Sequence, residues 1–272
     1  MKQISILGCG WLGLPLAKTL IGNGYKVKGS TTSETKIPAL ENFGINPFLV
    51  TLSAVESLTD ENEIDSFLEN SKILIIDIPP KLRSVSNETF VGKIQNFIPF
   101  IEKSTVKKVL FISSTSVYAD STSSLNITEE TILNPITESG KQLLEAEELL
   151  LNNINFHTTI LRFGGLIGEG RHPIHFLAGR KDIENPEAPI NLIHQADCIG
   201  IIEAIIKRDF FGETFNAVAP FHPSRKEYYS QKAIEFHLPL PEFDETKPSV
   251  GKLISGEKVG RLLKYNFTFS KL

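Results

Sequence analysis

Three glycines near the start of the chain have the spacing of a phosphate-binding turn. They lie in Gly8-Cys9-Gly10-Trp11-Leu12-Gly13, between an apolar run at residues 2–7 and a helical pattern at residues 12–21. The first glycine allows a tight bend, the second allows close backbone approach to a diphosphate, and the third allows the helix to pack on the strand. We therefore expect this turn to bind a dinucleotide through Gly8, Gly10, Trp11, Leu12 and Gly13. The alternative is a strand-to-helix turn that binds no ligand.

The residues after the second expected strand, 25–30, bear on the choice between NADP and NAD. An acid at this strand end would bind the ribose hydroxyls of NAD. Here the hydroxyls of Thr31, Thr32 and Ser33 come first, and the acid Glu34 comes late. Hydroxyls and Lys36 suit a 2′-phosphate, so we expect NADP to be preferred, with NAD as the alternative. A simpler interpretation is that Thr32 or Ser33 only caps the next helix.

The elements that position this turn alternate along the first half of the chain. Apolar runs typical of strands lie at 2–7, 25–30, 47–51, 72–78, 107–113 and 156–162. Helical patterns lie between them at 12–21, 34–43, 61–70, 87–103 and 138–152. Continuous apolar strands separated by helices indicate a parallel sheet covered on both faces. The sequence therefore predicts an α/β fold, a Rossmann-type doubly wound parallel sheet with a smaller C-terminal substrate lobe.

The pattern changes after Gly168, where a stretch containing proline and histidine begins. Shorter patterns follow at 190–194, 196–207, 213–217, 224–236 and 257–264. We predict a nucleotide-binding domain at residues 1–168 and the smaller lobe at 169–272, with some of its segments returning to the sheet.

Several motifs, taken in order, resemble the extended short-chain dehydrogenase/reductase superfamily, in its NAD-dependent epimerase/dehydratase branch. One is Leu110-Phe111-Ile112-Ser113-Ser114-Thr115-Ser116-Val117-Tyr118, a serine-rich strand end followed by Val-Tyr. Others are Leu161-Arg162-Phe163-Gly164-Gly165-Leu166-Ile167-Gly168-Glu169-Gly170-Arg171, Asn191-Leu192-Ile193-His194-Gln195-Ala196-Asp197 and Glu213-Thr214-Phe215-Asn216. The resemblance implies an NAD(P)-dependent oxidoreductase or epimerase that acts on a small polar substrate, with sugar- or nucleotide-linked compounds as candidates.

The resemblance also implies roles for individual residues. Ser114 matches the hydroxyl that bonds the substrate oxygen, and Lys141 matches the lysine that binds the nicotinamide ribose. The family's Tyr-x-x-x-Lys has Thr137 in place of its tyrosine. A phenol titrates near pKa about 10 and a nearby cation lowers that value, whereas an alkyl hydroxyl is a much weaker acid. The sequence thus resembles an atypical member, although Lys141 also has the spacing to pair with Glu145 on the helix.

Two groups are candidates for a substitute acid or base. Tyr118 follows the serine-rich strand end, where it either faces the nicotinamide or packs as a buried aromatic. His194 and Asp197 either form a coupled pair near the substrate, or Asp197 stabilises the start of a helix while His194 has a structural role.

Other candidates are assigned more broadly. Arg162 either holds a substrate anion or forms a buried ion pair, and Arg171, His194 and Arg225 are substrate candidates. His172 and His175 have helical spacing but lack a third ligand, so we expect no metal. Cys9 is small enough for the glycine turn, and a redox role lacks a resolving cysteine. The remaining expected cofactor contacts are Ile78, Pro79, Ser113, Lys141 and Phe163.

Composition limits the classes of partner. The formal net charge is −4, and no basic cluster suggests nucleic acid. The two cysteines are far apart in sequence, and no apolar run reaches the length of a membrane span. We expect a cytoplasmic protein, monomer or homodimer, whose partner is a small-molecule substrate. The alternative function is a non-catalytic NADP(H)-binding protein that senses redox state or regulates a partner.

Overall fold

The computed structural model describes residues 2–55, 60–80, 88–122 and 126–271. These residues form two compact units that each draw on several parts of the chain. Unit 1 comprises residues 1–117, 135–162 and 202–214, and unit 2 comprises residues 118–134, 163–201 and 215–272. The division at residue 168 remains a prediction about how the chain is organised into domains.

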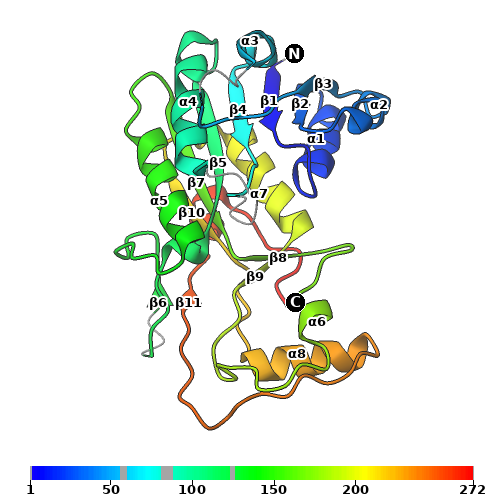
Figure 1. The fold of residues 1–272 in the computed structure, drawn as a ribbon, viewed down its shortest axis with the longest axis vertical. Helices are drawn as coiled ribbons and strands as arrows, with labels where there is room; N and C mark the ends of the chain where they lie inside the picture. The colour runs from blue at the N-terminus through cyan, green and yellow to red at the C-terminus, as the bar shows by residue number, and fades with distance from the viewer. Residues whose placement is uncertain (1, 56–59, 81–87, 123–125, 272) are drawn as a thin grey trace. The chain divides into compact units, whose positions relative to one another are not determined.

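The central element is a seven-stranded sheet with the order β10-β7-β5-β4-β1-β2-β3 (Figure 1). Its strands are β1 (Gln3–Leu7), β2 (Lys26–Thr31), β3 (Asn46–Leu49), β4 (Ile73–Ile76), β5 (Lys108–Ser114), β7 (His157–Phe163) and β10 (Thr214–Ala217). The pairs of β1 with β2, β1 with β4, β2 with β3 and β4 with β5 are all parallel. The predicted doubly wound α/β fold is confirmed. The strand order reverses between β1 and β4, which is where such sheets open a crevice for a ligand.

Helices connect these strands at the expected places. They are α1 (Gly13–Gly22), α2 (Ile37–Asn42), α3 (Glu61–Leu68), α4 (Phe90–Lys103), α5 (Glu138–Leu151) and α7 (Gln195–Arg208). Asp60, Thr89 and Thr137 begin α3, α4 and α5 as N-caps, each accepting a backbone N–H three residues later. The helix expected at 34–43 is instead a 3₁₀ turn at Glu34–Lys36 followed by α2, which has Pro38 in its first turn. The helix expected from residue 87 begins later, at Phe90, because Thr89 is extended and serves as its N-cap; residue 87 itself lies outside the described part.

Polar side chains from β1 and β2 satisfy the last carbonyl groups of α3. The Ser5 hydroxyl donates to the Phe67 carbonyl at 2.7 Å, and Gln3 donates to the Glu69 carbonyl at 2.8 Å. The ammonium group of Lys28, a buried residue, donates to the carbonyls of Ser66 and Glu69. A cation at a helix C-terminus also interacts favourably with the helix dipole. These contacts explain three polar residues in β1 and β2, namely Gln3, Ser5 and Lys28.

A buried ion pair joins α5 to β7. Arg162 and Glu147 are 3% and 1% exposed, and an Nη of the guanidinium lies 2.6 Å from a carboxylate oxygen. The Ser113 hydroxyl donates to the same carboxylate. Burial of two opposite charges requires this geometry, because either charge alone would be strongly destabilising. Arg162 therefore has the structural role that the sequence left open.

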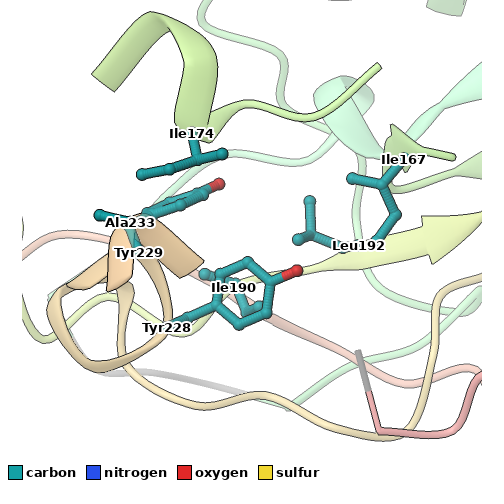
Figure 2. Packing of buried hydrophobic residues seen from close by; sticks show 7 residues of the cluster. All are labelled: Ile167, Ile174, Ile190, Leu192, Tyr228, Tyr229 and Ala233. Carbon is teal, nitrogen blue, oxygen red and sulfur yellow. The ribbon is translucent and has the colours of Figure 1, made fainter. Parts of the chain in front are cut away.

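Unit 2 contains short elements that periodicity alone did not reveal. They are β6 (Asn126–Ile127), β8 (Gly165–Ile167), α6 (Ile174–Leu177) and β11 (Leu253–Ile254). The expected elements are β9 (Leu192–His194), α8 (Arg225–Glu235) and α9 (Glu257–Leu263). A hydrophobic cluster joins α6, α8, β8 and β9 (Figure 2), formed by Ile167, Ile174, Ile190, Leu192, Tyr228, Tyr229 and Ala233. Of the described helices, none combines the length and apolar character needed to cross a membrane.

Candidate functional site

The glycine turn has the geometry that its spacing predicts. Gly8 has φ +107°, a conformation that L side chains rarely adopt, and a Cβ there would overlap the Asp77 carbonyl oxygen. The N–H of Gly8 donates to the Ser30 hydroxyl at 2.9 Å. A Cβ at Gly13 would overlap the carbonyl oxygen of Gly8. Two of the three glycines are therefore required by the fold itself.

Gly10 differs from the other two glycines. A Cβ built at this position has none of the described atoms within 4 Å, and its φ lies outside the left-handed region. Among the described residues, the fold thus leaves the place of a Cβ at Gly10 open. Within the described structure, no side chain caps the start of α1 at Leu12. The first turn of this helix can therefore present backbone N–H groups to an anion.

A pocket of about 310 Å³ lies at the carboxyl ends of β1, β2 and β4, within unit 1. Six of the expected cofactor residues line it: Gly8, Gly10, Thr31, Thr32, Ile78 and Pro79. Cys9 and Lys36 line it as well. The sequence did not single out nine others: Leu7, Ser30, Val50, Thr51, Leu52, Asp77, Glu88, Phe90 and Lys93. A pocket at the reversal of strand order fits a nucleotide.

The end of β2 contributes hydroxyls and a cation to this pocket. Thr31, Thr32 and Lys36 line the pocket, whereas Ser33 and Glu34 are not part of its described lining. The Ser33 hydroxyl lies 2.8 Å from that of Thr35 and does not cap the following 3₁₀ turn. Lys36 has no ion pair among the described residues. The strand end therefore presents a positive charge, and the capping interpretation is wrong for Ser33.

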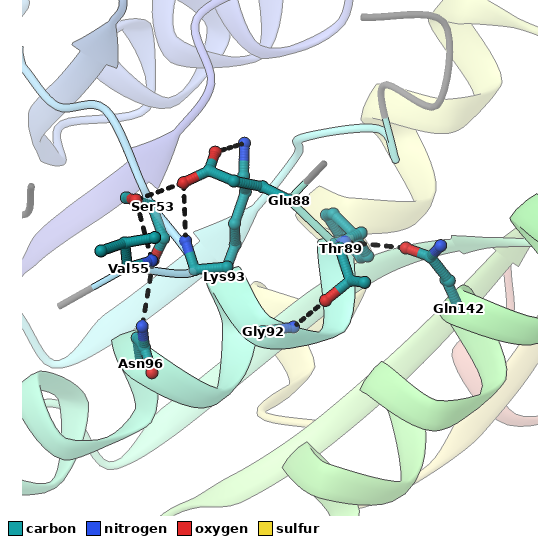
Figure 3. Close-up of polar contacts among 10 residues, drawn as sticks. Ser53, Val55, Glu88, Thr89, Gly92, Lys93, Asn96 and Gln142 are labelled. Atoms are coloured by element: carbon teal, nitrogen blue, oxygen red, sulfur yellow. Dashed lines mark hydrogen bonds and ion pairs between the residues drawn. The ribbon is translucent and has the colours of Figure 1, made fainter. Parts of the chain in front are cut away.

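The opposite wall of the pocket is a polar network between α4 and the segment after β3 (Figure 3). The Glu88 carboxylate accepts hydrogen bonds from the Ser53 hydroxyl and, at 3.2 Å, from the Ala54 N–H. Its other oxygen lies 2.9 Å from the Lys93 ammonium. The Ser53 hydrogen bond and the Lys93 cation lower the pKa of Glu88, so this carboxylate is ionised.

Cys9 packs inside the turn beside β2. A Cβ at Gly29 would lie 2.5 Å from its sulfur, so the glycine in β2 makes room for this side chain. Burial, assisted by the Asp77 charge, raises the pKa of the Cys9 thiol to about 12. A neutral buried thiol is a poor redox centre, and the packing role that we expected for Cys9 accounts for the residue.

Ser114 and the start of α5 lie close together within unit 1. The Ser114 oxygen accepts the Ser116 N–H at 3.2 Å, and a Cβ at Gly140 would overlap the Ser116 carbonyl oxygen. Thr137 caps α5 by accepting the Gly140 N–H at 3.1 Å. One turn later, Lys141 is exposed, and no pair with Glu145 occurs in the described structure. The lysine is thus available for a ligand, while the Thr137 oxygen is used as a cap.

Two expected cofactor residues are buried away from solvent. The Ser113 hydroxyl faces the buried pair of Glu147 and Arg162. Phe163, at the end of β7, is 2% exposed and belongs to unit 2. Contacts of Ser113, Lys141 and Phe163 with a cofactor remain predictions.

Tyr118 is a buried aromatic side chain in unit 2. It is 1% exposed, and its hydroxyl donates to the Asn216 side-chain carbonyl at 2.9 Å. The Lys252 ammonium donates to the Tyr118 backbone carbonyl at 2.7 Å. These contacts match the packed interpretation, and they use the hydroxyl that an acid or base would need.

His194 and Asp197 make most of their described contacts with the segment at residues 265–269, and not with each other. The buried Asp197 carboxylate accepts hydrogen bonds from the Tyr265 hydroxyl at 2.8 Å and from two backbone N–H groups, at Thr268 and Phe269. The His194 ring stacks on Phe269, with centroids 3.7 Å apart, and its Nδ1 accepts the Ala196 N–H. Burial lowers the pKa of His194, and the Asp197 charge partly opposes this effect. The structural interpretation of this pair is favoured.

His172 also has a structural environment. Its Nδ1 accepts the Ile174 N–H, and its Nε2 lies 3.0 Å from the Tyr228 hydroxyl. Burial lowers the pKa of His172 to about 4. The described residues contain no group of three or more His, Cys, Asp or Glu that could hold a metal.

The two remaining arginine candidates lie in unit 2. Arg171 is exposed in the turn after β8, and Arg225 begins α8. The Arg225 guanidinium donates to the Glu184 carbonyl at 3.0 Å, so it already fixes a loop. Substrate binding by Arg171, His194 or Arg225 remains a prediction.

Comparison with known proteins places these features in context. No protein-family model matches the chain. Protein YeeZ of Escherichia coli K12 is 33% identical over 270 residues, covering 99% of this chain and 97% of YeeZ. A structure named as a candidate NAD-dependent epimerase/dehydratase, from Methylobacillus flagellatus, superposes with TM-score 0.80 at 24% identity, covering 99% and 94% of the two chains. UDP-glucuronic acid 4-epimerase of Bacillus cereus, in complex with NAD, gives TM-score 0.75 at 18% identity, covering 98% and 94%.

Proposed function

Because the chain belongs to the family of Protein YeeZ, we propose that it is an atypical member of the short-chain dehydrogenase/reductase superfamily, which binds a nicotinamide dinucleotide in the unit 1 pocket and acts as an oxidoreductase or epimerase. The observation that carries this proposal is the open space at Gly10, in a turn whose other two glycines the fold requires. A glycine that the fold does not need is explained by a ligand that comes close to the backbone.

The charge at the end of β2 supports NADP as the preferred form. A 2′-phosphate would meet the hydroxyls of Thr31 and Thr32 and the ammonium of Lys36, all of which line the pocket. Lys36→Met is expected to weaken NADPH binding about tenfold and to leave NADH binding nearly unchanged. Lys26→Met, at the exposed opposite end of β2, is the matched control. Equal loss for both cofactors would contradict the assignment.

The residues assigned to the chemistry are Ser114 and Lys141. The Ser114 hydroxyl would orient or polarise a substrate oxygen, and the exposed Lys141 ammonium would bind the nicotinamide ribose. A bound nicotinamide would supply or accept the hydride. Thr137 can donate a hydrogen bond but is a poor proton carrier, because an alkyl hydroxyl titrates far from working pH. The substrate we propose is small and polar, with sugars and sugar nucleotides the first to test.

The experiment has two stages. Calorimetric titration with NADPH and NADH tests binding. Turnover is tested by stopped-flow in both directions: oxidation of bound NADPH by a panel of carbonyl compounds, and reduction of bound NADP⁺ by a panel of sugar nucleotides. We expect Lys141→Met to lower the turnover rate relative to wild type. The variant should still bind the adenosine half of the cofactor. Tight binding without turnover of any panel member would instead support a non-catalytic, regulatory NADP(H)-binding protein.

A further inference from the structure

Two segments that line the pocket opposite β1 are far apart in sequence. The first, residues 50–54, follows β3, which is the edge strand of the sheet. The second, residues 88–93, contains the start of α4. Val50, Leu52 and Phe90 give this side of the pocket an apolar surface. Since β3 has a sheet neighbour on one side only, the segment after it needs another attachment to form a fixed wall.

The Glu88 carboxylate provides that attachment. It accepts hydrogen bonds from the Ser53 hydroxyl and the Ala54 N–H. Two further contacts support the junction: Asn96 donates to the Ser53 carbonyl at 3.3 Å, and a Cβ at Gly92 would lie 2.9 Å from that of Ala54. Figure 3 shows Glu88, which lies just before α4, and Asn96, in the second turn of α4, making polar contacts with the segment after β3.

The α4 side of the junction is itself fixed. Thr89 caps the helix by accepting the Gly92 N–H at 3.0 Å. The Phe90 N–H donates to the side-chain carbonyl of Gln142, from α5, at 2.7 Å, and the Phe90 ring stacks on Phe111 with centroids 6.3 Å apart. Glu88 therefore joins the segment after β3 to a helix start that is already held in place.

The same carboxylate neutralises a lysine of the pocket. Lys93 lies 2.9 Å from Glu88, and the two side chains are 27% and 22% exposed. Lys36 also lines the pocket but has no ion pair within the described residues. The charges of Glu88 and Lys93 cancel, so this pair gives the wall no net charge. An anionic group of a ligand would therefore bind more favourably near Lys36.

We propose that Glu88 is a positioning residue that closes this wall and cancels the charge of Lys93, so that the wall accepts the flat, uncharged base of a nucleotide and excludes a phosphate. The inference rests on the proposed function, because it takes the pocket to be a nucleotide site. It goes beyond that function by assigning ligand selectivity within the pocket to one carboxylate outside the glycine turn.

Adenosine and 2′,5′-ADP are the probes, because they share a base and differ in charge. Binding is followed through the fluorescence of Trp11, the one tryptophan of the chain, in the glycine turn. Glu88→Ala removes the attachment, and we expect it to weaken adenosine binding at least tenfold. Glu88→Gln keeps an amide oxygen to accept from Ser53 and Ala54, so adenosine affinity should stay within about threefold of wild type.

Glu88→Gln also leaves the positive charge of Lys93 without its partner. The resulting change in the affinity for an anionic ligand would not occur if Glu88 had a purely structural role. We expect it to bind 2′,5′-ADP about three- to tenfold more tightly than wild type at low salt. That gain should vanish at 0.5 M salt, which screens exposed charges, and in the double variant with Lys93→Met. Asp209→Asn is the control, because Asp209 pairs with Lys108 outside the pocket lining.

Three results would overturn the inference: wild-type adenosine affinity in Glu88→Ala, equal loss in Glu88→Gln and Glu88→Ala, or no adenosine binding by the wild type. The proposed function fails separately. A wild-type protein that binds adenosine but neither NADPH nor NADH would refute the dinucleotide assignment and leave the role of Glu88 intact.

Discussion

Substitution of Gly10 by valine separates the needs of a ligand from the needs of the fold. The structure has open space where the Cβ would lie, and the backbone there is accessible to any residue. Replacing a glycine in an unstrained conformation also reduces the entropy of the unfolded chain. We therefore expect the free energy of unfolding of Gly10→Val to stay within about 1 kcal/mol of wild type.

The effect on cofactor binding should be much larger. The valine side chain would occupy the space through which a diphosphate reaches the backbone N–H groups of the turn. Hydrogen bonds to a charged group contribute about 1.5–3 kcal/mol each. Loss of one or two such bonds would raise the dissociation constant at least about tenfold, since each 1.4 kcal/mol is tenfold.

Gly13→Ala is the matched comparison, because its Cβ would overlap the Gly8 carbonyl oxygen. Overpacking of this kind costs about 1–3 kcal/mol, so this variant should lose stability as well as affinity. Urea denaturation measures the unfolding free energies, and NADPH titration measures the affinities. If Gly10→Val binds NADPH as tightly as wild type, the reasoning about the second glycine is refuted.

Three further predictions concern groups outside the pocket or buried in its wall. Arg162→Met should lower the unfolding free energy by about 3–5 kcal/mol in urea denaturation, because it leaves the Glu147 carboxylate buried without a cation; an unchanged midpoint would contradict the buried pair. The pKa of His172 is lowered to about 4, below its unfolded value, so stability should fall as pH drops from about 6.5 to 4. In His172→Phe, the melting temperature should depend less on pH in this range, and an unaltered slope would contradict the role of His172. Cys9 and Cys198 are buried, and the pKa of the Cys9 thiol is raised to about 12, so a thiol reagent at pH 8 should modify neither before unfolding; rapid modification of Cys9 in the folded protein would show that its thiolate is accessible.

The sheet could be predicted because its information is local. Strands such as β4, buried at all four positions, are continuous apolar runs, and three of the helices between the strands, α3, α4 and α5, have hydroxyl or acidic N-caps. The glycine turn is likewise local, since three positions within six residues define it. Elements of two to four residues, such as β6 and α6, are too short to show a period.

The wall of the candidate site formed by the segment after β3 and the start of α4 could not be predicted, because its contacts join distant residues. Glu88 meets Ser53 across 35 positions, and nothing in either segment specifies the other. The surroundings of the candidate acids and bases could not be predicted for a related reason, and their roles remain predictions. Tyr118 and Asp197 have residue types suited to catalysis, but Asn216 and Tyr265, far along the chain, take up their polar atoms.

Titration of the wild-type protein with NADPH, followed by calorimetry and by the fluorescence of Trp11, tests the central claim most directly. The account predicts one site per chain, a change in Trp11 emission on binding, and competition by 2′,5′-ADP. No heat and no change in emission at millimolar NADPH or NADH would contradict it.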